Sequence, residues 1–175
     1  MKLKQLTRHV WAGCAYWPVP VMVWIVEGRN GLTLVDGGLP SMWNPMHEAL
    51  HTTFRGRSLN RILLTHGHGD HVGMLYALTE HLQLPITAHE FEIPFLSGEK
   101  SYTTLRPGSV NKDIQPGDLF TIFFGKLRRP IEKFTANMEE SLQSGALVAR
   151  LKPKLTACAH FGVVKDASIQ YINLV

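Results

Sequence analysis

The chain has 175 residues, of which 45% are apolar and 18% charged, a globular composition that suits a single domain over residues 1–175. Its apolar run at residues 14–26 is too short to cross a bilayer, and no signal peptide is recognisable behind the basic N-terminus. We therefore expect a cytoplasmic protein without a membrane partner. The net charge of +4 is modest, and no aromatic residues alternate with the basic residues at 126–133, which argues against nucleic acid as a partner.

The first half of the chain alternates short apolar runs with helical patterns. A Gly/Asn turn between two β-rich runs predicts a hairpin, and apolar residues at helical spacing predict the helices. The expected elements, in chain order, are strands at 19–26 and 32–35, a helix at 45–54, a buried strand at 61–65, a helix at 72–82 and a short strand at 86–88.

The second half begins with a segment rich in Gly, Pro, Ser and Thr at 94–116, which predicts a loop. A strand is expected at 119–124. Asn137 and Glu140 resemble a capping box, so a helix is expected from Met138 onward. A last short strand at 155–159 ends at His160. Since strands and helices alternate along the whole chain, the predicted fold class is α/β.

One loop concentrates residues that bind metal ions. Three of the nine histidines fall within positions 66–71, and Asp70 completes the pattern His-x-His-x-Asp-His directly after a predicted strand. Imidazole and carboxylate groups suit zinc and other first-row divalent ions. His66 and His68 lie two apart and face the same side of an extended loop, whereas Asp70 and His71 are adjacent and diverge toward a second ion. Gly67 and Gly69 are expected to let the backbone fold tightly around the metals.

The segment Thr65-His66-Gly67-His68-Gly69-Asp70-His71 resembles the signature loop of the metallo-β-lactamase superfamily. Leu34-Val35-Asp36-Gly37-Gly38 and Ala157-Cys158-Ala159-His160-Phe161-Gly162 are similar to further parts of that family. The resemblance implies an αββα sandwich. The chain is short for this family, as if an internal block before Gly117 were missing, so we expect the second sheet to be incomplete.

The same resemblance implies a set of metal ligands. His66 and His68 would bind a first ion, and Asp70, His71 and His160 a second one. Asp118 either bridges the two ions or belongs to a simple turn, and these two interpretations are left even. Asp36 resembles a residue that steadies the metal loop. The sequence departs from the family at one point, because no histidine lies between His89 and His160 and the first ion therefore lacks a third imidazole.

The resemblance implies a hydrolase that uses water activated by one or two zinc ions, with manganese or iron as alternatives. Asp70 would orient the attacking water as well as bind metal, and the substrate would be a small molecule with an ester, thioester, lactone or amide bond. Two alternatives stay open. One is a degenerate, non-catalytic member with a structural or interaction role, and the other is a nucleic-acid hydrolase. A sheet edge left by the internal loss would favour pairing into a homo-oligomer.

Overall fold

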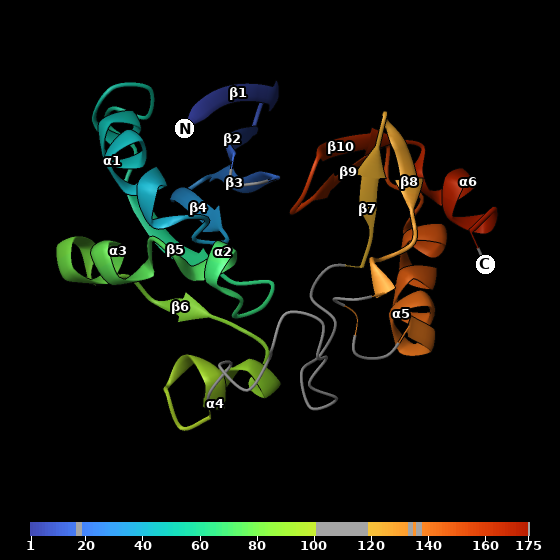
Figure 1. Ribbon diagram of the computed structural model, residues 1–175. Coiled ribbons are helices and arrows are strands. Elements are labelled where there is room, and N and C mark those ends of the chain that lie inside the picture. The colour runs from blue at the N-terminus through green and yellow to red at the C-terminus, as the bar shows by residue number, and fades with distance from the viewer. Residues whose placement is uncertain (17–18, 101–118, 133–134, 136–137, 175) are drawn as a thin grey trace. The chain divides into compact units, whose positions relative to one another are not determined.

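The computed structural model describes residues 1–16, 19–100, 119–132, 135 and 138–174. The chain divides into two compact units, Met1–Leu96 and Ser97–Val175, here called the first unit and the second unit (Figure 1). The single domain that the length predicts stays a prediction. Within the described residues, no helix is long and apolar enough to cross a membrane.

The first unit is built on a mixed sheet of six strands that lie side by side in chain order. The first four strands pair with one another antiparallel, and the fifth and sixth strands are added in parallel to the fourth. The predicted hairpin and the next two predicted strands are confirmed, and the sheet gains two N-terminal strands that the sequence patterns did not predict. The strands are β1 (Lys2–Thr7), β2 (Val10–Tyr16), β3 (Pro20–Gly28), β4 (Gly31–Val35), β5 (Leu59–Leu63) and β6 (Ile86–Thr87).

The two longer helices of the first unit, α1 (Trp43–His51) and α3 (Leu75–Leu82), each bury one apolar face. α1 buries Met46 and Ala49, and α3 buries Leu78, as their helical spacing predicts. The predicted helix at 72–82 is divided into two, and the loop predicted from residue 94 is wrong at its start, where a short helix buries Phe95. The helices are α1 (Trp43–His51), α2 (Gly69–Val72), α3 (Leu75–Leu82) and α4 (Ile93–Leu96), with 3-10 turns η1 (Pro40–Met42) and η2 (Glu90–Glu92).

The core of the first unit lies against the middle of the sheet. Because side chains alternate along a strand, every second residue of β3 and β4 faces the same layer. The residues so placed are completely or almost completely buried, and they are Val21, Val23, Ile25, Leu32 and Leu34. This rigid sheet carries at its carboxyl edge the loops that follow β4 and β5.

The second unit contains two separate antiparallel pairs of strands in its described part. They are β7 (Thr121–Phe123) with β8 (Lys126–Arg128), and β9 (Leu155–Cys158) with β10 (Gly162–Lys165). Two helices, α5 (Met138–Leu151) and α6 (Ala167–Ile172), pack with them around a small core that includes Phe120, Ile122 and Tyr171. The strands and helix predicted for this half are confirmed, whereas Asn137, the expected helix cap, lies outside the described residues.

Gly73, between α2 and α3, lies where two backbone segments cross closely. Its N–H donates to the carbonyl of Gly38 at 2.7 Å, and a Cβ at Gly73 would overlap both that carbonyl and Pro40. We expect Gly73→Ala to lower the free energy of unfolding by about 1–3 kcal/mol, the usual effect of overpacking. Denaturant unfolding measures this, with Gly69→Ala as the matched control, because a Cβ there would meet nothing within 4 Å. Equal stability of the two variants would contradict the prediction.

Candidate metal centre

The histidine-rich loop connects β5 to α2 at the carboxyl edge of the sheet. Val35 at the end of β4 pairs with Leu63 at the end of β5, so the residues that follow these two strands are neighbours. The N–H of Asp36 donates to the carbonyl of Leu63 at 2.9 Å. The parallel pairing thus brings Asp36 to the base of a loop that lies 29 residues further along the chain.

His66 and His68 direct ring nitrogens at each other. Nε2 of His66 lies 3.0 Å from Nδ1 of His68, and the two rings meet edge to face. His66 is almost completely buried. Its other nitrogen, Nδ1, lies 3.1 Å from the hydroxyl of Thr65, which fixes the orientation of the ring. The extended loop therefore places both side chains on the same side, as their spacing predicts.

His71 and Asp70 form a second pair beside the first. Nε2 of His71 lies 3.8 Å from Oδ1 of Asp70, and the rings of His66 and His71 have centroids 3.9 Å apart. Nδ1 of His71 lies 3.0 Å from Oδ2 of Asp36, and both side chains are about 1% exposed. Holding Nδ1 in this way leaves Nε2 as the nitrogen that faces Asp70.

Asp36 holds the loop in place through several contacts of its carboxylate. Its Oδ1 accepts from the backbone N–H of Thr65 at 2.8 Å, and its carboxylate also accepts from the Thr65 hydroxyl and lies against His71. Asp36 has a φ of 63°, in the left-handed region, where Asp and Asn are better tolerated than most residues. This geometry is that of a carboxylate behind metal-binding histidines, where it fixes tautomer and ring orientation.

Glu92 also supports the loop, a role that the sequence patterns did not predict. Its side chain is 1% exposed, and Oε2 accepts from the backbone N–H of Gly67 at 2.8 Å, between His66 and His68. No local pattern separates Glu92 from the exposed Glu90 two residues earlier, because the contact joins segments that are 25 residues apart. A fully buried carboxylate is uncommon and needs such a partner.

We expect Glu92→Ala to weaken metal binding by about 10- to 100-fold, the usual effect of removing a group behind the ligands. The backbone N–H of Gly67 would lose a charged acceptor, and the peptide between His66 and His68 would lose its anchor. Glu92→Gln keeps an acceptor of the same shape and should recover most of the affinity. Equilibrium dialysis with zinc measures both variants. Equal affinities for the Glu92→Ala variant and the wild type would show that Glu92 does not position the loop.

The remaining predicted site residues lie elsewhere in the chain. His160 follows β9 in the second unit and is half-buried, so its convergence with the loop stays a prediction. Asp118 lies outside the described residues. His89 is exposed, and its Nδ1 accepts from the N–H of Phe91 at the start of η2. A Cβ at Gly69 would meet no protein atom within 4 Å, and the expectation that Gly69 lets the loop fold around metal ions stays a prediction.

The geometry of the loop fits a divalent metal ion. Two nitrogens bound to one zinc at 2.0–2.1 Å in tetrahedral geometry lie about 3.3 Å apart, close to the 3.0 Å between His66 and His68. The donors are imidazole and carboxylate, the set that zinc, manganese and iron accept. Thr65 holds Nδ1 of His66 and Asp36 holds Nδ1 of His71, so these two rings are oriented in advance.

Sequence comparison places this loop in a known family. A sequence model of the Metallo-beta-lactamase superfamily matches residues 16–132. Probable metallo-hydrolase YybB of Bacillus subtilis is 25% identical over 204 aligned residues, which cover 91% of this chain and 91% of YybB. The alignment is longer than the 175 residues of this chain, so it must contain gaps in the sequence of this chain. Such gaps agree with the expected internal shortening.

Solved structures extend the likeness to the fold. The metallo-beta-lactamase from Pontibacter korlensis has a TM-score of 0.71 at 15% identity, covering 98% of this chain and 96% of that one. TTHA1623 in a di-iron-bound form has a TM-score of 0.66 at 21% identity, with 90% and 95% covered. These identities are low, so the likeness shows the α/β metallo-beta-lactamase fold and confirms that prediction. Because the family match spans more than half of the chain and includes the whole histidine-rich loop, this chain belongs to the metallo-beta-lactamase superfamily.

Proposed function

We propose that this chain is a metal-dependent hydrolase that cleaves an ester, thioester, lactone or amide bond in a small molecule. The observation that carries the proposal is the pairing of donors in the loop. His66 and His68 face each other at 3.0 Å, and Asp70 lies beside His71 at 3.8 Å, so two neighbouring pairs are present on one short segment. Family membership and the similarity to probable metallo-hydrolases support the same activity.

Each residue of the loop has a separate task in this proposal. His66 and His68 would hold one ion, and Asp70 and His71 would hold another together with His160. A divalent ion bound there supplies Lewis acidity and lowers the pKa of a coordinated water to about 7. Asp70 is half-buried and would also orient that water toward the substrate carbonyl, and Asp118 would add a carboxylate if it reaches both ions. We propose zinc as the ion, with manganese or iron as alternatives.

A degenerate member without catalysis is the second candidate. The chain has no histidine between His89 and His160, so His66 and His68 have no third imidazole from that stretch. Catalytic zinc sites usually keep three protein ligands and an open position. We therefore infer that the first ion is held weakly, and that the chain binds fewer than two ions tightly and turns substrate over slowly.

Metal stoichiometry combined with a substrate panel tests both candidates. Protein dialysed against buffered zinc, manganese or iron is assayed for bound metal, then for hydrolysis of ester, thioester, lactone and amide substrates, with an RNA substrate as a further arm. Metal-dependent turnover of a small substrate supports the proposal. Stoichiometric metal without turnover on any substrate favours the degenerate member. Two tightly bound ions with rapid turnover would overturn the inferred weak site, and cleavage of RNA alone would overturn the proposed substrate class.

A further inference from the structure

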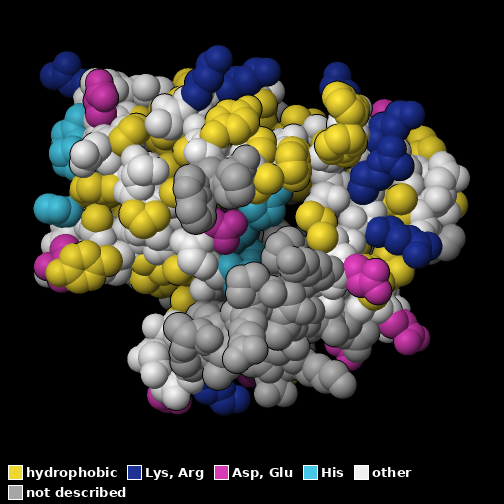
Figure 2. All heavy atoms as spheres, in the orientation of Figure 1, with side chains coloured by type: hydrophobic (Ala, Val, Ile, Leu, Met, Phe, Trp, Pro, Cys, Tyr) yellow, Lys and Arg dark blue, Asp and Glu magenta, His cyan; other side chains and the backbone are white. Residues whose placement is uncertain are grey.

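A second group of histidines lies on the outside of the first unit, away from the buried loop. His47 and His51 are both exposed and lie one turn apart on α1, and their ring centroids are 4.4 Å apart. His81 near the end of α3 is exposed too, with its ring centroid 6.5 Å from that of His47. Figure 2 shows histidine side chains gathered at the left edge of the molecule, over α1 and α3. We propose that these three residues form a site for a first-row divalent metal ion.

The spacing of the pair on α1 suits chelation. Residues at positions i and i+4 of a helix are neighbours on one face, so the two imidazoles project in the same direction. Two imidazoles bound to one ion at about 2.0–2.1 Å per bond bring their rings to roughly the separation seen between His47 and His51. The backbone of the helix keeps the two residues one turn apart before any ion arrives.

The tautomer of His51 is also suitable for an ion. Nδ1 of His51 lies 2.8 Å from the backbone carbonyl of His47, which accepts only, so Nδ1 carries the proton. The lone pair of the neutral ring is therefore on Nε2, the nitrogen that points away from the helix backbone. A histidine that donates one ring N–H to a carbonyl and offers the other nitrogen is the usual arrangement of a metal ligand.

His81 adds a third imidazole from another helix. Its ring stacks on Trp43 with centroids 5.1 Å apart and planes 7° apart, and Trp43 in turn lies 5.3 Å from His47. The ring nitrogens of the three histidines do not all lie within 4.8 Å of one another in the structure, so binding one ion requires the exposed side chains of His47 and His81 to change rotamer, which such side chains do in nanoseconds.

The proposed site differs in chemistry from the loop. It contains imidazoles alone and is open to solvent, whereas the loop combines imidazole with carboxylate and is largely buried. Imidazole ligands suit copper, nickel and zinc, and affinity for such ligands is greatest for Cu²⁺. An ion here would connect α1 to α3. It would therefore stabilise the folded first unit by mass action, independently of any hydrolytic activity.

Trp43 provides a local signal for the test, because Cu²⁺ quenches the fluorescence of a nearby indole. Zinc-loaded protein is titrated with Cu²⁺ while tryptophan fluorescence and the Cu²⁺ electron paramagnetic resonance spectrum are recorded. We expect saturable quenching, a spectrum with nitrogen ligands, and a higher melting temperature. His47→Ala and His51→Ala should each weaken this binding by at least about tenfold, since even groups behind the ligands contribute that much. Trp43→Phe should remove the quenching and keep the resonance spectrum.

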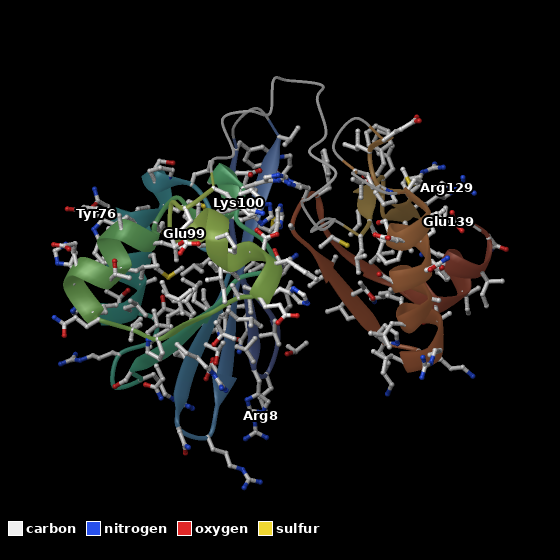
Figure 3. All side chains as sticks on the ribbon, turned by 90° about the horizontal axis from the view of Figure 1, so that it is seen from below. Arg8, Tyr76, Glu99, Lys100, Arg129 and Glu139 are labelled. Carbon is white, nitrogen blue, oxygen red and sulfur yellow. The ribbon has the colours of Figure 1, made fainter. Side chains whose placement is uncertain are left out.

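His9→Ala is the matched control, because His9 is exposed and lies beside Arg8 in the turn between β1 and β2. Figure 3 shows Arg8, the neighbour of His9, well away from Tyr76, which projects into solvent from α3, the helix that also carries His81. This control should bind Cu²⁺ as the wild type does. Unchanged quenching in both α1 variants would overturn the site. Unchanged quenching in His81→Ala alone would overturn the assignment of His81 as a ligand.

Discussion

Asp36→Ala should lower the free energy of unfolding of the metal-free protein by about 3–5 kcal/mol, because more than one buried donor would lose a charged acceptor, at about 1–3 kcal/mol for each donor. Asp36 is almost completely buried and accepts from the backbone and hydroxyl of Thr65 while it lies against Nδ1 of His71. Alanine would leave these donors without their acceptor and would also have to adopt a left-handed backbone with φ near 63°. Denaturant unfolding measures the loss.

Asp36→Asn separates these contributions. Asparagine tolerates the left-handed region and keeps one acceptor oxygen, so the backbone strain is absent and part of the hydrogen bonding remains. We expect a loss intermediate between the wild type and Asp36→Ala. Thr65→Val removes the hydroxyl alone and should cost about 1 kcal/mol. If the free energy of unfolding of the Asp36→Ala variant lies within about 1 kcal/mol of the wild-type value, Asp36 does not hold the loop in place.

The loop could be predicted because its chemistry is local. Two histidines two positions apart share a side once the segment leaves a strand in extended form. The structure places His66 beside His68 as expected, whereas the adjacent Asp70 and His71, which were expected to diverge, lie 3.8 Å apart at Oδ1 and Nε2. The hairpin before it was predictable for the same reason, since its turn residues and alternating apolar residues are neighbours in the sequence.

Contacts between distant segments could not be predicted in this way. Glu92 reaches Gly67 across 25 residues, and nothing in its own surroundings marks it for that role. β1 carries lysine and glutamine and buries little, so its place at the sheet edge depends on backbone pairing with β2 rather than on an apolar pattern. The cluster on α1 and α3 has the same origin, because Trp43 and His81 are brought together only by the packing of two helices.

No third imidazole is assigned to the first ion, so the two pairs of proposed ligands in the loop are unequal. His66 and His68 are well oriented, but they supply two ligands. Asp70 and His71 also supply two, and the proposed addition of His160 completes a set of three, the usual number for a catalytic zinc. Orientation alone does not retain an ion, because each further ligand adds a bond that must break before the ion leaves. We therefore expect the pair that contains His71 to determine how much metal stays bound.

His71→Ala should abolish tight metal binding, whereas His66→Ala should leave most of it in place. The His71 variant loses a direct ligand of the proposed three-ligand site, and the carboxylate of Asp36 loses the ring that it orients. We expect its zinc affinity to fall by at least about 100-fold, beyond the range for groups behind the ligands, and metal-dependent hydrolysis to be lost with it. Equilibrium dialysis at buffered nanomolar zinc followed by elemental analysis measures how much of the tightly bound ion each variant retains. His9→Ala is the matched control, because His9 lies on an exposed turn.

Loss of the tightly bound ion in His66→Ala but not in His71→Ala would reverse the assignment. It would mean that the third ligand of the first pair comes from another part of the chain.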